Sequence, residues 1–434
     1  MTTRKLSALV LILIFLAGCS SPPLASKPSE PPASLPTETS LPTETAIPTL
    51  PATETPLPTE TLPPTETPVP TEEPDITPGI ILFIGDGMGA AYRQAATWLV
   101  KGQDGVLAMD SLPVRGWAQT VNIKGDITDS GAAGTSIATG QNTYNGYIGM
   151  DAQQQPLTTI LELAEQAGWA TGLVTTVPMA HATPATFSAH YPDRSDLPEI
   201  ARQMIAQGVD VLLGGGEDDF FSTDENGCFP GNGNQPKGSG LVGPAIQQGY
   251  TYVCNREELL SVDTAPGTQL LGLFAADEMP SPYSPTLAEM TQTALAILSQ
   301  DPDGFFLMVE AGQIDWAGHE LDAEQAMHFT VGLDTAVTMA MIFTLERENT
   351  LLIVTADHET GGMSVNLDGS GSWRQDGPFT MPDGTSFWVD WQGTSHTSAN
   401  IPVTAQGPHA EMLAGEYHLT HLYETMLVML LSNQ

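Results

Sequence analysis

The stretch GIILFIGDGMG, residues 79–89, joins an unbroken apolar run to an acidic residue set between glycines. An apolar run of this length predicts a strand buried on both faces, which is typical of a parallel sheet covered by helices. The glycines favour tight backbone geometry, so Asp86 taken alone is explained equally well as a turn residue or as a functional carboxylate.

Similar apolar runs recur along the chain and alternate with helical patterns. The runs are ATGLVTT (170–176), VDVLLGG (209–215), FFLMVEAG (305–312) and LLIVTADH (351–358). Helical patterns cover 157–168, 284–300 and 323–345. This alternation predicts an α/β domain with a mostly parallel central sheet and helices on both faces. Polar residues follow the ends of these runs, where open α/β sheets place their sites.

The first 19 residues predict a secretory signal peptide, with Arg4 and Lys5 ahead of an apolar run. The run ends in Leu-Ala-Gly-Cys, which resembles a bacterial lipobox in which Cys19 is acylated. A lipobox predicts a protein anchored by lipid to a membrane outside the cytoplasm, in the periplasm or on the cell surface. An ordinary signal peptide with an incidental Cys19 is the alternative.

Residues 20–78 consist mainly of Pro, Thr and Glu in imperfect repeats. Such a segment has almost nothing apolar to bury, so it predicts a disordered, extended stalk. The globular catalytic domain is therefore expected over 79–434.

The charge of the chain is strongly acidic, with a formal net charge of −38 from 51 Asp and Glu against 13 Lys and Arg. This charge excludes nucleic-acid binding through a basic patch. An anionic substrate would need a local positive charge, which bound divalent cations can supply.

Two cysteines, Cys228 and Cys254, remain after Cys19 is set aside. In an oxidising compartment an even pair is a disulfide candidate, and two free thiols are the alternative. No spacing typical of a thiolate metal site is present.

The segment EAGQIDWAGH, residues 310–319, has the pattern of a metal site. Glu310 ends an apolar run, and Asp315 and His319 are four residues apart. On a helix both would project from one face toward a single ion, and this pairing suits zinc. A surface helix pair is the alternative. His396, in GTSHTSANIP, is a candidate third ligand.

A candidate nucleophile lies in ITDSGAAGTSIATG, residues 127–140. Ser130 follows Asp129 and precedes small residues that can begin a helix, where free N–H groups favour phosphate. A simple N-cap is the alternative. No G-x-S-x-G elbow surrounds Ser130, so activation by a metal rather than by a histidine is expected.

Taken together, IGDGMG, DSGAAGT, HATPAT, EAGQIDWAGH, TADHETGG and a late Ser-His-Thr resemble the alkaline phosphatase family across essentially all of 79–434. The resemblance implies hydrolysis of phosphate monoesters to an alcohol and inorganic phosphate, through a phosphoserine on Ser130. It also implies a possible homodimer. The apolar segment 422–431 suits either the core or an interface.

The same resemblance implies two zinc ions, one magnesium ion and their ligands. One zinc would be held by Asp315, His319 and His396. The second would be held by Asp86, Asp357 and His358, joined by Ser130 during turnover. The magnesium would be held by Asp86, Thr183 and Glu310. Arg194 would grip the phosphate. Within the range known for the family, the chain has His181 where some members have Asp and Trp316 where others have Lys or His, and both positions bear on magnesium affinity and the pH profile.

Two other functions compete with this interpretation. A phosphodiesterase or phosphonate hydrolase of the same superfamily is the nearest, although a diester has fewer free oxygens for Arg194 to bind. A surface lipoprotein that binds metal or phosphate without catalysis is the more remote.

Overall fold

A computed structural model describes residues 77–231, 233–371 and 373–433 of the chain. The predicted signal peptide (1–19) and the predicted stalk (20–78), apart from Thr77 and Pro78, lie outside the described residues. The first described strand, β1, begins at Gly79.

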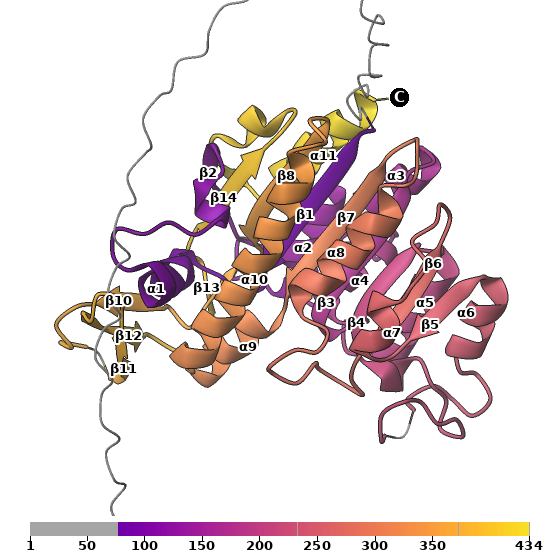
Figure 1. Ribbon diagram of the computed structural model, residues 1–434, viewed down its shortest axis with the longest axis horizontal. Helices are drawn as coiled ribbons and strands as arrows, with labels where there is room; N and C mark the ends of the chain where they lie inside the picture. Colours follow the sequence, from indigo (N-terminus) through magenta and orange to yellow (C-terminus); the bar gives the residue numbers. More distant parts are fainter. Residues whose placement is uncertain (1–76, 232, 372, 434) are drawn as a thin grey trace, which may run out of the picture. The chain divides into compact units, whose positions relative to one another are not determined.

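A ten-stranded sheet forms the centre of the described domain (Figure 1). Its pairings are parallel except for those of β14, which runs antiparallel to both of its neighbours. The prediction of a mostly parallel α/β fold is therefore confirmed. In spatial order the strands are β15 (Gly415–His418), β2 (Val114–Gln119), β14 (Ile401–Gln406), β8 (Thr350–Ala356), β1 (Gly79–Gly85), β7 (Phe305–Ala311), β3 (Ala170–Pro178), β4 (Val211–Gly215), β6 (Gln269–Leu273) and β5 (Tyr250–Val253).

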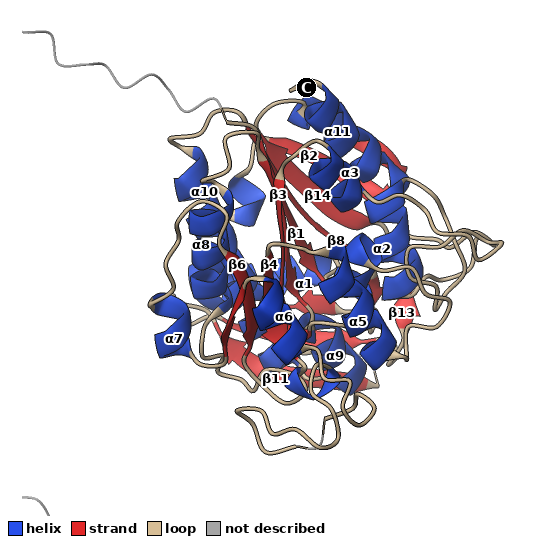
Figure 2. Cartoon of the chain, turned by 90° about the vertical axis from the view of Figure 1, so that its right-hand side faces the viewer, coloured by secondary structure: helices blue, strands red, loops and turns tan. Residues whose placement is uncertain are grey.

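Helices cover both faces of the sheet, as Figure 2 shows. On one side α8 and α10 pack against each other and α1 packs on α10; on the other side α2, α3, α4, α5 and α11 form a second layer. The helices are α1 (Ala90–Lys101), α2 (Ser130–Thr139), α3 (Ile160–Gln166), α4 (Ala182–Ser188), α5 (Leu197–Gln207), α6 (Val242–Gln248), α7 (Arg256–Leu260), α8 (Leu287–Leu298), α9 (Gln313–Glu320), α10 (Ala323–Thr344) and α11 (Thr420–Leu431). The short 3-10 turns in the described part of the chain are η1 (Met109–Ser111), η2 (Glu217–Asp219) and η3 (Ala410–Leu413).

The strand β1 is buried along its whole length between β7 and β8. Its five large apolar side chains, residues 80–84, are fully enclosed, and each contributes roughly 1.5–3 kcal/mol by leaving water. Gly79 is required at its start because a Cβ there would meet the ring of Phe305 at 2.4 Å. The apolar run therefore fixes the centre of the sheet and the position of the residue that follows it.

Two small antiparallel sheets lie in the segment between β8 and β14. The three-stranded one has the order β10 (Ser364–Asn366), β12 (Ser386–Trp391), β11 (Arg374–Thr380), and the two-stranded one pairs β9 (Glu359–Thr360) with β13 (His396–Thr397). None of these strands was expected from the sequence. The strands β9, β10 and β13 have only two or three residues, and β11 is largely exposed. The strand β12 is mostly buried but has only three consecutive apolar residues before Asp390.

The apolar C-terminal segment belongs to the core. It forms most of α11, which buries Leu422, Met426, Met429 and Leu430 and packs against α2 and α3. Among the described helices, α10 is long and apolar enough to cross a membrane, and half of its most apolar window is buried inside the domain. Packing on the sheet accounts for that composition.

The predicted disulfide joins Cys228 to Cys254. It ties the loop after η2 to the residue that follows β5. Glu217 fixes the same loop, since its carboxylate accepts the backbone N–H groups of Cys228 at 2.7 Å and Phe229 at 3.0 Å.

Removal of this disulfide is expected to destabilise the protein. Its cysteines are 26 residues apart in sequence, and a loop of this size is worth about 3–4 kcal/mol on the chain-entropy account. Cys228→Ala combined with Cys254→Ala should lower the free energy of unfolding by that amount in a urea titration. Ser261→Ala, an exposed change close by, is the control. Equal stability of the cysteine variant and the control would contradict the prediction.

Candidate metal and nucleophile site

The predicted site residues come from segments far apart in the sequence and meet at the carboxyl edge of the central sheet. Asp86 follows β1, Glu310 lies near the end of β7, and Asp357 and His358 follow β8. The helices α2, α4 and α9 and the strand β13 bring the rest, namely Ser130, Thr183, Asp315, His319 and His396. The helical spacing predicted for Asp315 and His319 is confirmed, because both lie on α9.

The first group consists of Asp315, His319 and His396. The two Nε2 atoms are 3.1 Å apart, and the Asp315 carboxylate lies 3.2 Å from one and 3.5 Å from the other. The Nδ1 atom of His319 lies 2.6 Å from the Thr394 carbonyl, and that of His396 lies 2.9 Å from the Thr128 carbonyl. A carbonyl only accepts, so each ring carries its proton on Nδ1. Two Nε2 lone pairs and a carboxylate therefore face one another, an arrangement that a cation fits.

The second group consists of Asp86, Asp357 and His358, all fully buried. Their ligand atoms lie within 4.8 Å of one another, and the Nε2 atom of His358 lies 3.3 Å from Asp357 and 3.4 Å from Asp86. One oxygen of each carboxylate, Asp86 Oδ1 and Asp357 Oδ2, has no hydrogen-bond partner. Buried carboxylate oxygens are seldom left unsatisfied, so this group also fits a cation.

The third group adds Glu310 and His181 to Asp86, again within 4.8 Å. Glu310 Oε1 has no partner, and the Thr183 hydroxyl donates to Asp86 Oδ2 at 3.4 Å. The guanidinium of Arg194 lies 3.2 Å from His181 Nε2. Arg194 can only donate, so Nε2 accepts and the proton of His181 sits on Nδ1. This tautomer leaves a set of oxygen ligands, which suits Mg²⁺.

Burial and mutual repulsion dominate the electrostatics of the carboxylates. Burial, followed by the charges of Asp357 and Asp315, holds the pKa of Asp86 well above its usual range. Burial likewise raises the pKa of Glu310 to about 7. Burial also acts to raise the pKa of Asp315. Without a metal ion, however, a second proton on Nε2 of His319 lets that ring donate to Asp315, and this hydrogen bond, with the charges of the neighbouring imidazoles, holds the pKa of Asp315 well below its usual range. The repulsion between these groups is relieved by a dication.

Ser130 is the first residue of α2, and Asp129 is the N-cap. The Asp129 carboxylate accepts the Ala132 N–H at 2.9 Å, which leaves the Ser130 hydroxyl free of capping. That hydroxyl lies 3.3 Å from Asp86 Oδ2 and 3.4 Å from His358 Nε2. The structure therefore places the predicted nucleophile against the second group.

Arg194 reaches the same place from the loop before α5. One of its nitrogens lies 3.1 Å from Asp129 Oδ2, and its side chain keeps 26% of its surface exposed. Burial, and then the charge of Arg194, lowers the pKa of His181 to about 3, so His181 is neutral. The Trp316 ring packs edge-on against His181 with ring centres 5.8 Å apart. Arg194 is thus held by the residue that precedes Ser130, and part of its side chain is open to solvent.

Sequence reasoning missed two threonines that orient the carboxylates. Thr360 donates to Asp315 Oδ1, and Thr175 donates to Glu310 Oε2. Thr360 lies inside the TADHETGG motif, and Thr175 is a polar residue in an apolar strand run. Both positions were therefore visible in the sequence as polar residues beside predicted ligands.

The fold and the site define an α/β protein in which a serine at the head of a helix stands among three groups able to hold metal ions. The family model described as alkaline phosphatase matches residues 78–385. Alkaline phosphatase 3 of Bacillus subtilis is 37% identical over 69% of this chain and 64% of its own length. Streptomycin-6-phosphate phosphatase of Streptomyces griseus is 34% identical over 80% of this chain and 89% of its own length.

A solved structure agrees with these matches. The cold-active alkaline phosphatase of the psychrophile Shewanella sp. superposes with a TM-score of 0.70 at 30% identity, covering 81% of this chain and 99% of that one. The chain belongs to the alkaline phosphatase family. It spans slightly less than two thirds of the Bacillus subtilis relative, 64% of its length.

The raised pKa of Glu310 predicts that metal binding releases protons in a pH-dependent way. With a pKa of about 7, Glu310 holds a proton at about pH 6 and has largely lost it at about pH 8, whereas a bound cation requires the carboxylate. Calorimetry of zinc and magnesium binding in buffers of different ionisation heat should show more proton release at the lower pH. The Glu310→Gln variant has no titratable proton at this position, so its proton release on metal binding should differ less between the two pH values. Equal release at both pH values would contradict the prediction.

Proposed function

We propose that this chain hydrolyses phosphate monoesters through a phosphoserine intermediate on Ser130. One observation carries the proposal: the Ser130 hydroxyl lies within 3.4 Å of two members of a buried metal-capable group, while Arg194 is held beside it by Asp129. A nucleophile, a cation site and a guanidinium thus converge where one phosphoryl group would fit.

The proposed metal content is two zinc ions and one magnesium ion. Asp315, His319 and His396 would hold one zinc, and Asp86, Asp357 and His358 the other. Asp86, Thr183 and Glu310 would hold magnesium. When bound, the zinc ions act as Lewis acids that lower the pKa of the serine hydroxyl and stabilise the leaving oxygen. Three dications outweigh the four carboxylates, so the pocket would be positive in a chain of net charge −38.

Ser130 performs the first chemical step. Its Oγ gives up its proton to solvent and forms a bond to phosphorus as the ester P–O bond breaks, and the leaving alkoxide takes up a proton and departs as the alcohol. Water then attacks the phosphoserine, which releases inorganic phosphate and restores the hydroxyl. The N-terminal end of α2 presents free backbone N–H groups and a positive dipole to the phosphoryl oxygens, which favours both steps.

Arg194 binds and orients the phosphoryl group. A guanidinium can donate two parallel hydrogen bonds to the free oxygens of a monoester. Asp129 holds one side of this guanidinium and caps the helix that carries Ser130. The nucleophile and the phosphate-binding group are therefore aligned by one carboxylate.

The proposed location is outside the cytoplasm, with the chain anchored by lipid on Cys19 and separated from the membrane by the stalk of residues 20–78. The disulfide between Cys228 and Cys254 supports an oxidising compartment. A homodimer stays a proposal drawn from the family. The streptomycin-6-phosphate phosphatase among the relatives suggests that the leaving group differs between members.

Replacing the nucleophile should abolish turnover. Ser130→Ala is expected to lower the rate on p-nitrophenyl phosphate by several orders of magnitude and to prevent formation of the phosphoenzyme trapped at acidic pH. Ser136→Ala on the same helix is the matched control, because the Ser136 hydroxyl lies within hydrogen-bond distance of the Ala132 carbonyl (2.9 Å) and Asn142 Oδ1 (2.8 Å), neither of which belongs to the proposed site. A labelled phosphoenzyme on the Ser130 variant would refute the assignment.

Replacing the proposed phosphate-binding residue, Arg194, should distinguish a phosphomonoesterase from a phosphodiesterase and from a non-catalytic lipoprotein. Arg194→Gln removes a charge-assisted contact worth about 1.5–3 kcal/mol, so kcat/KM for p-nitrophenyl phosphate should fall by roughly 10- to 150-fold. The much lower rate on bis-p-nitrophenyl phosphate should change less, because a diester offers fewer free oxygens. A diester preference in the unaltered protein would favour the phosphodiesterase. No activity on either ester with zinc and magnesium added would favour the non-catalytic lipoprotein.

A further inference from the structure

A tight corner joins the helix that carries two metal-capable residues to the long helix behind it. The helix α9, with Asp315 and His319, ends at Glu320, and α10 begins at Ala323. Leu321 turns the corner in the left-handed conformation, at φ 58° and ψ 40°. A leucine keeps such a conformation only where its surroundings hold it, so the residues that contact this corner set the direction of α9.

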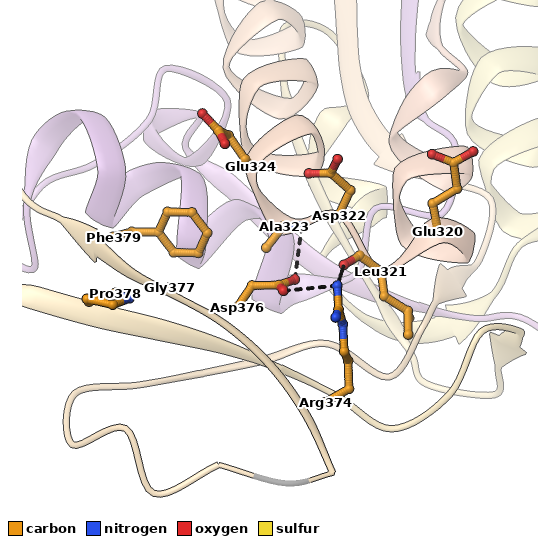
Figure 3. A pocket seen from close by; sticks show the side chains of 10 residues that line it. All are labelled: Glu320, Leu321, Asp322, Ala323, Glu324, Arg374, Asp376, Gly377, Pro378 and Phe379. Atoms are coloured by element: carbon orange, nitrogen blue, oxygen red, sulfur yellow. Dashed lines mark hydrogen bonds and ion pairs between the residues drawn. The ribbon is translucent and has the colours of Figure 1, made fainter. Parts of the chain in front are cut away.

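Two residues of β11 hold the corner, as the close-up in Figure 3 shows. Arg374 donates to the Leu321 carbonyl at 3.3 Å and pairs with Asp376 at 3.2 Å. Asp376 accepts the Ala323 N–H at 3.4 Å and the Trp391 indole N–H at 2.9 Å. The positive charge of Arg374 thus lies at the carboxyl end of α9, and the negative charge of Asp376 lies at the amino end of α10. Both helix dipoles favour this arrangement.

The strand after β11 also leads to the third member of the first group. Trp391 ends β12, and the chain reaches His396 five residues later. In between, Gln392 and Gly393 donate to the Gly361 carbonyl at 2.9 and 3.1 Å, and the Thr394 carbonyl accepts Nδ1 of His319. The three-stranded sheet of β10, β11 and β12 therefore contacts the corner after α9. The segment that follows β12 also brings His396 next to His319.

We propose that Arg374 and Asp376 are positioning residues for the Asp315–His319–His396 site. This inference rests on the proposed function, in which that group holds one zinc ion. The contacts of Arg374 and Asp376 named above reach Leu321, Ala323 and Trp391, and none of these three residues belongs to the second group. Loosening the corner would tilt α9 and separate its two ligands from His396, whereas Asp86 and Asp357 directly follow β1 and β8 and would keep their places.

The pair can be altered without leaving a buried charge. Arg374 has 46% of its side-chain surface exposed and Asp376 has 19%, and a cavity of about 480 Å³ opens beside them. Loss of one member therefore leaves the other within reach of water, and the domain is expected to fold.

The test measures the two zinc affinities separately. Metal-free Arg374→Gln and Asp376→Asn proteins are titrated with zinc against a competing chelator. One affinity should fall by about tenfold, the lower end of the loss that outer partners of metal ligands cause, and the other should change by less than about twofold. Arg374→Lys keeps the charge and a donor, and should restore most of the affinity. Cadmium NMR of substituted protein should assign the weakened site to the group with two imidazoles.

Arg256→Gln is the matched control, because Arg256 is similarly exposed, at 43%, and pairs with Glu289 away from the site. Unchanged zinc affinities in both test variants would overturn the positioning role. An equal loss at both sites, accompanied by a lower melting temperature of the metal-free protein, would reduce the pair to a structural contact. If the unaltered protein binds no zinc and hydrolyses no monoester, the proposed function fails instead.

Discussion

Two imidazole lone pairs that face each other across 3.1 Å, with a carboxylate beside them, are the constraint on which the rest of this site depends. Backbone carbonyls of Thr394 and Thr128 fix both rings with their protons turned away. The arrangement repels itself unless a positive charge lies between the nitrogens. The neighbouring groups around Asp86 repeat the pattern with carboxylate oxygens that lack partners. These groups therefore repel one another in the folded protein until cations bind between them. Ser130 and Arg194 lie around the position that those cations would occupy.

The fold can tolerate this repulsion because apolar strands enclose it. The strands β1, β7 and β8 are buried along their full lengths, and their carboxyl ends deliver Asp86, Glu310 and Asp357. The apolar area buried in these strands stabilises the domain by far more than the local cost of crowded carboxylates, which is why charged residues can be so completely enclosed. Threonines at the strand ends and in the motifs, Thr175 and Thr360, orient individual oxygens.

Features with a regular period were predictable from the sequence, and features that depend on distant contacts were not. The apolar runs predicted the central strands, and the four-residue spacing predicted that Asp315 and His319 share a helix face. His396 was a candidate third ligand from its residue type alone, but no local pattern joins β13 to α9, so its assignment to the same ion as Asp315 and His319 rested on the family resemblance. The tie between Arg194 and Asp129, 65 residues apart, likewise had no local signal. The strands β10 and β11 gave no signal because their side chains are partly exposed and form no apolar run, and the mostly buried strand β12 has only three consecutive apolar residues.

The position of β1 at the start of the domain has a consequence for synthesis of the chain. Gly79 pairs with Phe305 on one side and Thr350 on the other, so the most apolar strand emerges from the ribosome long before either partner. At about 5–20 residues per second the wait is roughly 10–50 s. During that interval an unpaired apolar strand is open to aggregation, so the nascent chain carries this hazard until residues 305 and 350 have been translated.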